Sequence, residues 1–241
     1  MEQTLYLVRH GHTMGTQSEL MYGNTELPVT YEGLSEVADF AAQGIYPDPE
    51  GAAVYTSGMV RALQTLAVMY GADPDSAFVS MEEIYPERTD NVKSAAAKMD
   101  SLCRVPHMTE PLLREINLGS FEMKTVSEVL SDERGKAWLE GRLQDPQFEG
   151  GDSMSGFARR VEQGIRNVID ESAGRGDDTM IVVIHGGVIA HILDSFFPGT
   201  YSNLWDWTPQ PGTGYEIRLI DGAPQSWKPV GKTGFRVVPM K

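Results

Sequence analysis

The stretch Leu5-Tyr6-Leu7-Val8-Arg9-His10-Gly11 decides the fold of this chain. Its four apolar residues predict a strand that ends where Arg9, His10 and Gly11 begin. Such a strand presents a cation and an imidazole at the edge of a sheet, and the glycine lets a ligand approach the backbone closely. Taken alone, the tripeptide fits a surface Arg-His pair in a turn better than a site. The rest of the chain must therefore decide between the two interpretations.

Other strands and helices follow the first in alternation. Strands are predicted at 52–56, 180–184 and 215–220 as well as at 4–8, and the run Met180–Ile184 is apolar at every position, as in a central strand with both faces covered. Apolar residues recur at helical spacing over 34–41, 62–69 and 157–168, and another helix is expected from the Gly186-Gly187 pair to a stop before Pro198. This pattern predicts βα units and a largely parallel sheet.

Length and composition indicate a single soluble domain spanning 1–241. A net charge of −14 makes nucleic acid and anionic membranes improbable partners, whereas a small anion could still bind where cations cluster. One cysteine, Cys103, excludes an intramolecular disulfide and a multi-cysteine metal site. With no basic leader and no apolar run near the roughly 18 residues of a membrane span, we expect a cytoplasmic protein.

The segment 76–109 interrupts the βα pattern. It begins with acidic residues, contains a predicted helix over 92–102 and reaches Pro106 near its end. We expect an inserted lid here, and a solvated surface excursion is an equally good interpretation because long insertions change stability little. A lid would bring four cations near the pocket: Arg88, Lys93, Lys98 and Arg104.

Reactive side chains stand at four strand ends or helix starts. These are Arg9 with His10, Arg61 in Ser57-Gly58-Met59-Val60-Arg61, Glu115 in Leu113-Arg114-Glu115, and His185 before Gly186-Gly187. The carboxyl ends of parallel strands share one edge of a sheet, so these side chains can converge. Two imidazoles, two guanidinium groups and one carboxyl group suit phosphoryl transfer.

Each of these five side chains has an expected role in that reaction. A neutral imidazole is a nucleophile toward phosphorus, which fits His10, and planar cations match the charge spread over a phosphoryl group, which fits Arg9 and Arg61. His185 and the helix start behind it would stabilise a non-bridging oxygen. Glu115 would donate a proton to the leaving alkoxide and later accept one from water, provided that burial raises its pKa.

In these motifs the chain resembles the histidine phosphatase superfamily, the phosphoglycerate-mutase-like proteins. The matching motifs are Leu5–Thr13 with Arg-His-Gly, Ser57 with Arg61-Ala62-Leu63-Gln64-Thr65, Leu113–Gly119 around Glu115, and His185-Gly186-Gly187-Val188. The resemblance covers 4 to about 220 and implies an α/β three-layer αβα sandwich with a mostly parallel sheet. It further implies a phosphohistidine intermediate, and we expect substrate contacts from Thr16, Tyr22, Gly23 and Gly186.

Three positions depart from the family pattern. His12 stands where many members have Glu, Thr16 where many have an Asn that contacts the phosphoryl group, and Met123 follows Glu122 where Gly is frequent. These departures bear on the choice of substrate more than on the chemistry.

We therefore predict a phosphomonoesterase that needs neither metal nor cofactor and hydrolyses small phosphorylated metabolites through His10. A phosphoglycerate mutase is the nearest alternative, although Ile116–Gly119 after the acid and Gly187 after the second His-Gly resemble the phosphatase branch. A catalytically silent phospho-ligand-binding module is more remote, as is a metal site built on His10 and His12 with His185. The natural substrate and the oligomeric state are left open.

Overall fold

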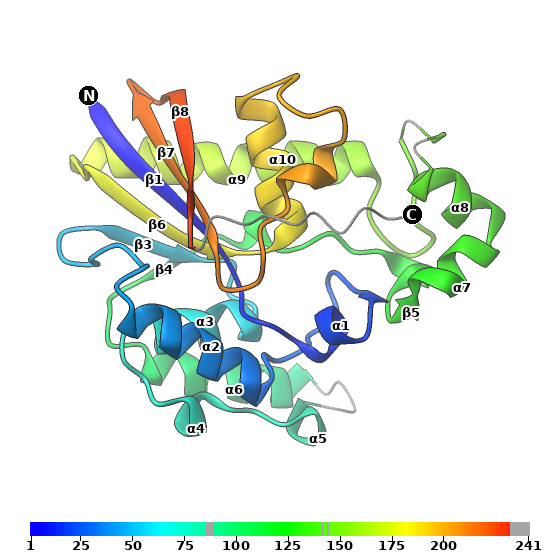
Figure 1. Cartoon of the computed structure of the whole chain (residues 1–241), viewed down its shortest axis with the longest axis horizontal. Coiled ribbons are helices and arrows are strands. Elements are labelled where there is room, and N and C mark those ends of the chain that lie inside the picture. Colours follow the sequence, from blue (N-terminus) through cyan, green and yellow to red (C-terminus); the bar gives the residue numbers. More distant parts are fainter. Residues whose placement is uncertain (85–88, 141, 144, 232–241) are drawn as a thin grey trace.

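The centre of the molecule is a six-stranded sheet in the order β4-β3-β6-β1-β7-β8 (Figure 1). This computed structural model describes residues 1–84, 89–140, 142, 143 and 145–231. Strands β4 (Met108–Thr109), β3 (Ala53–Thr56), β6 (Thr179–Ile184) and β1 (Glu2–Arg9) run parallel. Strands β7 (Gly214–Ile220) and β8 (Ala223–Val230) complete the sheet in antiparallel pairing. The predicted mostly parallel sheet is confirmed.

Helices cover both faces of this sheet because its central strands are apolar on both sides. Leu5 and Leu7 of β1 pack in a core with α9 (Met154–Arg175) and α10 (Gly186–Phe196). Val8 packs on the opposite face with α2 (Tyr31–Ala42) and α3 (Val60–Met69). Figure 1 shows the sheet between these helix pairs. The alternation of side chains along a strand thus produces the predicted αβα sandwich.

A smaller unit stands beside the sandwich. Strands β2 (Leu20–Met21) and β5 (Lys124–Thr125) form a two-stranded sheet, followed by α7 (Val126–Ser131) and α8 (Glu133–Leu139). Short helices lie in the connections between the larger elements: α1 (Met14–Gln17), η1 (Pro111–Leu113), η2 (Gly119–Phe121) and η3 (Leu204–Trp207). In the described part of the chain, no helix combines the length and apolar character needed to cross a membrane.

The segment 76–109 packs against the sandwich. It contains the end of α4 (Pro74–Ala77), then α5 (Met81–Ile84) and α6 (Thr89–Leu102), and α6 contacts α3. Ile84 and Met99 are fully buried in the same core as α3. Arg88 lies outside the described residues. This packing favours a structural contribution, while the lid role and the single-domain organisation stay predictions.

One prediction from the sequence is wrong. The glycine and proline in Gly222-Ala223-Pro224 predict a loop, but Ala223 and Pro224 begin β8, which pairs with β7. β8 is an edge strand, and an edge position tolerates proline because one row of backbone groups needs no partner. Pro224 therefore fits a strand at this place in the sheet.

Candidate active site

The predicted reactive residues meet at the carboxyl ends of the parallel strands. Arg9 ends β1 and His10 follows it, His185 follows β6 directly, and Arg61 lies in the first turn of α3, which comes just after β3. The register that pairs Arg9 with Ile184 places His10 beside His185, and their ring centroids lie 5.4 Å apart. A hollow of about 190 Å³ opens here, lined by Arg9, His10, Arg61 and Glu115 together with Gly186 and Gly187.

The environment of His10 fixes the tautomer of its ring. Nδ1 lies 2.8 Å from the carbonyl oxygen of Gly11, which can only accept a hydrogen bond, so Nδ1 carries the proton and Nε2 keeps its lone pair. Burial lowers the pKa of His10 well below its usual value of 6.5, and the charges of Arg61 and Arg9 lower it further. His10 is therefore a neutral imidazole with a free Nε2 at neutral pH.

His185 is held in the opposite tautomer. The Nε–H of Arg61 donates to its Nδ1 at 3.2 Å, so Nε2 carries the proton and donates to Ser57 Oγ at 2.8 Å. Burial, followed by the charge of Arg61, lowers the pKa of His185 well below 6.5. The site thus presents one imidazole with an available lone pair and one that carries a proton on Nε2.

Two guanidinium groups supply the positive charge of the hollow. Arg61 is fully buried, and its terminal nitrogens donate to the carbonyl oxygens of Thr25 (2.9 Å) and Gly23 (2.6 Å). Arg9 donates from Nη1 to the carbonyl oxygen of Pro209 at 2.8 Å. Its buried Nε has no hydrogen-bond partner among the described residues. A buried donor without a partner is costly, and an anion in the hollow would satisfy it.

The fifth residue, Glu115, faces the start of α10. Its carboxylate accepts the backbone N–H of Gly187 at 2.9 Å and of Ile116 at 3.0 Å. Burial raises the pKa of Glu115 above its usual 4.5, although these two hydrogen bonds and the charges of Arg61 and Arg9 act in the opposite direction. A side chain on Gly187 would collide with this carboxyl group, since its Cβ would lie 2.7 Å from Oε1.

Glu122 joins the two loops that carry the site. Its carboxylate accepts the backbone N–H groups of Gly23 (3.1 Å), Asn24 (3.0 Å) and Thr25 (3.2 Å), and the hydroxyl of Thr25 (2.6 Å). It also accepts the N–H of Leu118 at 2.8 Å, three residues beyond the acid. Since Gly23 and Thr25 hold Arg61, this one carboxylate links the position of Arg61 to the loop of Glu115.

The loop of Glu115 is also tied to α9. Arg160 donates to the carbonyl oxygens of Leu112 (2.8 Å), Arg114 (2.6 Å) and Glu115 (3.2 Å). Its guanidinium lies 3.3 Å from the carboxylate of Asp152. Irregular backbone beside a site must have its polar groups satisfied, and Arg160 does this for three carbonyl groups of the loop.

The expected substrate contacts divide into three groups. Gly186 lines the hollow, and Tyr22 lines both it and a neighbouring hollow. Gly23 does not line it but packs so closely that a Cβ would lie 1.8 Å from the carbonyl oxygen of Ile116, which excludes any side chain there. Thr16 lines only the neighbouring hollow, where its hydroxyl donates to the carbonyl oxygen of Thr13 at 2.7 Å.

His12 points away from the two central imidazoles. Its Nε2 lies 3.5 Å from Glu36 and its Nδ1 lies 3.3 Å from the hydroxyl of Thr16. His12 thus pairs with Glu36 of α2, and among the described residues it does not join His10 and His185 in one metal-holding cluster.

Some contributors escaped the sequence interpretation. The motif around Arg61 contains Ser57 but does not predict its contact with His185. The sequence also does not predict the five hydrogen bonds to the Glu122 carboxylate, because four of their donors lie nearly a hundred residues away in residues 23–25 and one lies in its own turn. Trp205 lines the hollow, whereas Trp207 of the same short helix η3 is fully buried. A helix of four residues gives no periodicity from which this difference could be predicted.

Similarity in sequence identifies the family of this chain. The sequence model of the histidine phosphatase superfamily (branch 1) matches residues 5–77 and 90–228. The 2,3-bisphosphoglycerate-dependent phosphoglycerate mutase of Chlamydia trachomatis is 25% identical over 225 residues, which cover 87% of this chain and 96% of that protein.

Solved structures show the same fold at lower identity. The alpha-ribazole phosphatase of Shigella flexneri superposes with a TM-score of 0.66 at 18% identity, covering 92% of this chain and 93% of that one. The phosphoglycerate mutase of Thermus thermophilus gives a TM-score of 0.61 at 20% identity, covering 96% and 100%. With the family's motifs gathered at one sheet edge and its sequence model matched along most of the length, the chain belongs to branch 1 of the histidine phosphatase superfamily.

Proposed function

We propose that this protein hydrolyses phosphate monoesters of small metabolites through a phosphohistidine on His10. The observation that carries the proposal is the state of His10: its ring is neutral and its Nε2 keeps its lone pair, next to Arg9, whose buried Nε has no acceptor in the described part of the chain. A nucleophile, His10, and an anion-binding group, Arg9, thus line the same hollow. Neither step below requires a metal or an organic cofactor.

In the first step the phosphoryl group moves from the ester to His10. The bond between His10 Nε2 and phosphorus forms while the bond between phosphorus and the ester oxygen breaks, and Arg9 and Arg61 balance the charge on the equatorial oxygens. The departing alkoxide takes the proton of Glu115, whose raised pKa keeps that proton available. The products of the step are a neutral alcohol, phosphohistidine and the Glu115 carboxylate.

In the second step water removes the phosphoryl group. Glu115 accepts a proton from water, whose oxygen forms the new bond to phosphorus as the bond to Nε2 breaks. Orthophosphate leaves, and His10 and Glu115 return to their starting states. The ring of His185 lies 5.4 Å from that of His10, and its Nε2–H would turn from Ser57 Oγ toward a phosphoryl oxygen.

A mutase is the second candidate, favoured by the name of the Chlamydia trachomatis relative. A mutase would return the phosphoryl group from His10 to a second hydroxyl of the bound product. The two activities share the first step and differ in the acceptor. Mixing the protein with 3-phosphoglycerate and measuring both released phosphate and 2-phosphoglycerate separates them, and phosphate release without isomerisation supports the hydrolase.

The decisive experiment is chemical trapping of the intermediate. After rapid mixing with a phosphate monoester and alkaline quenching, mass spectrometry should place one phosphoryl group on His10. His10→Ala should abolish both the adduct and turnover, whereas His107→Ala, which removes an imidazole paired with Asp100 outside the hollow, should keep both. Phosphate binding without adduct or turnover on a broad substrate panel would instead indicate a silent binding module.

The acid has its own test. Glu115→Gln should slow transfer from alkyl esters by about 10²–10⁴-fold, because their alkoxides need a proton, and slow a nitrophenyl ester far less. Equal slowing of both esters would contradict the role of Glu115 as the acid.

A further inference from the structure

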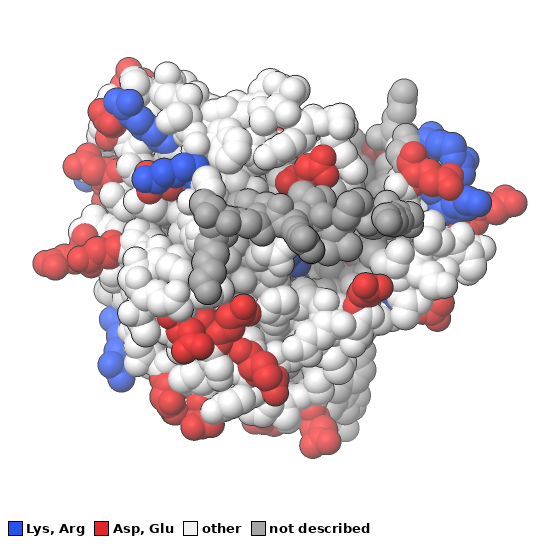
Figure 2. Space-filling view, viewed as in Figure 1, with Lys and Arg blue, Asp and Glu red and all other residues white. Residues whose placement is uncertain are grey.

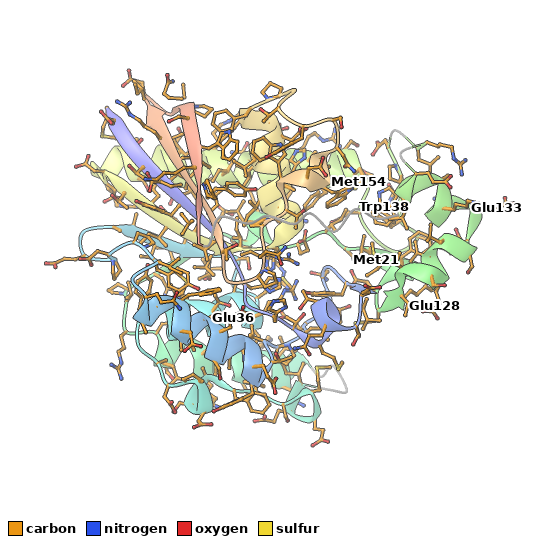
Figure 3. The ribbon with its side chains drawn as sticks, in the orientation of Figure 1. Met21, Glu36, Glu128, Glu133, Trp138 and Met154 are labelled. Carbon is orange, nitrogen blue, oxygen red and sulfur yellow. The ribbon has the colours of Figure 1, made fainter. Side chains whose placement is uncertain are left out.

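The hollow above His10 has an apolar side that phosphoryl transfer itself does not use. Besides the reactive groups, its lining contains Leu20 and Met21 of β2 and Trp205 of η3. These three side chains are partly exposed, whereas His10 and Arg61 are buried. They therefore stand between the reacting groups and solvent, where the alcohol part of an ester would lie. Figure 3 shows Met21 on the side of the molecule that carries α7 and α8.

A second hollow continues the first. It has a volume of about 270 Å³ and shares Arg9, Leu20 and Tyr22 with it. Val126 and Pro211 add further apolar surface, and Glu19 adds a carboxylate. Together the two hollows provide room for an alcohol larger than a glycerol unit, with apolar contacts along both parts.

Positive charge is confined to the place of the phosphoryl group. Among the described residues that line the two hollows, the lysines and arginines are Arg9 and Arg61 alone. His12 lines the outer hollow, but it faces Glu36. In Figure 2 acidic side chains gather over α2, whereas lysine and arginine side chains lie mainly at the edges of this face.

Resting on the proposed hydrolysis, we infer that the substrate is a phosphate monoester of an uncharged alcohol with a flat, apolar body. A second phosphate or a carboxylate on the alcohol would lose its water and face Glu19, and the described lining offers it no guanidinium or ammonium group beyond the two already engaged. A flat apolar body would instead cover Trp205 and the side chains of Leu20 and Met21. Stacking on an indole ring is favourable for any ring with an apolar face.

The charge part of the inference is tested with benzyl phosphate and 4-carboxybenzyl phosphate. The two esters share the reacting group and differ by one remote carboxylate. The ratio of their kcat/KM values therefore reports how the outer lining accepts that carboxylate. We expect benzyl phosphate to be hydrolysed with at least tenfold higher kcat/KM. Leu20→Arg should raise kcat/KM for 4-carboxybenzyl phosphate about tenfold by adding a cation. Equal or reversed preference in the unmodified protein would overturn the inference.

The apolar part is tested by the ratio of kcat/KM for benzyl phosphate to that for methyl phosphate. Trp205→Ala should lower this ratio about tenfold, mainly through KM, and Trp205→Phe should retain most of it. Leu130→Ala, which trims an exposed apolar residue of α7 that lines neither hollow, is the control and should leave the ratio as it is. If Trp205→Ala slows both esters equally, Trp205 is a structural residue and the inference fails.

Failure here and failure of the proposed function give different results. If 4-nitrophenyl phosphate is hydrolysed and labels His10 while the carboxylated ester is preferred, only the inference about the alcohol is overturned. If no ester labels His10, the proposed function and the inference fall together.

Discussion

Glu122 offers the sharpest test of how this site is held together. Glu122→Gln keeps the size of the side chain but replaces one carboxylate oxygen by an NH2 group. Oε2 accepts from Gly23 and twice from Thr25, and Oε1 accepts from Asn24 and Leu118. An amide oxygen in the place of Oε2 leaves its NH2 group opposed to two backbone N–H donors, so at least two hydrogen bonds are lost.

The size of the effect follows from those losses. Hydrogen bonds to a charged group contribute about 1.5–3 kcal/mol each. Asn24 is exposed, so water can replace its lost bond, whereas Leu118 is buried. We therefore expect the free energy of unfolding to fall by about 3 kcal/mol. Because Gly23 and Thr25 hold Arg61, a small shift of their loop should also lower kcat/KM, by about 10²-fold for a displacement near 1 Å.

Urea unfolding and steady-state hydrolysis of a phosphate monoester measure the two quantities. Glu133→Gln is the control, since Glu133 is exposed at the start of α8 and away from both loops (Figure 3), and its replacement should change stability by less than about 0.5 kcal/mol. A loss below about 1 kcal/mol in Glu122→Gln, or a loss of stability with unchanged kcat/KM, would refute the claim that this carboxylate connects the two loops.

Three further predictions concern pH, backbone and inhibition. In the pH profile of kcat/KM, the acid limb should lie below pH 6.5, because His10 must be neutral and its pKa is lowered. The alkaline limb should lie above pH 4.5, because Glu115 must be protonated and its pKa is raised. Glu115→Gln should remove the alkaline limb. Met123→Gly should raise the free energy of unfolding by about 1 kcal/mol in thermal melts, because Met123 has φ 62° and glycine adopts this left-handed backbone without strain. Met14→Gly is the control and should lower the free energy of unfolding, because glycine is unfavourable in α1. Hydrolysis should be unaffected by EDTA and inhibited by vanadate, which mimics the five-coordinate phosphorus of the transition state. If EDTA abolishes activity and a divalent cation restores it, Arg9 and Arg61 are not the groups that balance the phosphoryl charge.

The central sheet could be predicted because its strands carry their own signal. Met180–Ile184 is apolar throughout, and the structure buries all five residues. The shorter strands could not be found in this way. β2, β4 and β5 have two residues each, and pairing partners far along the chain determine them rather than any local pattern. β8 was missed because its prolines are acceptable only at a sheet edge, which is a property of the assembled sheet.

His10 and His185 could be named because each precedes a glycine, and Arg61 because it stands in the first turn of a helix, whereas Arg9 and Glu115 were found through the motifs around them. Its supporting contacts were out of reach, since a sequence does not show which backbone N–H groups meet at one carboxylate, as they do at Glu122. The left-handed backbone of Met123 gave a partial clue, because glycine is frequent there in the family and the structure shows the reason for it.

The register between β1 and β6 has a consequence for how freely this chain can be altered. His10 and His185 are 175 positions apart, yet the pairing of Arg9 with Ile184 places their backbones side by side. An insertion or a transplanted loop between the two strands leaves that placement unchanged as long as the pairing survives and Ser57 and Arg61 still hold the ring of His185. A slip of one residue would instead turn one strand's side chains to the opposite face and separate the imidazoles. The positions of His10 and His185 therefore do not depend on the loops that select a substrate, so those loops can be redesigned while the nucleophile keeps its place.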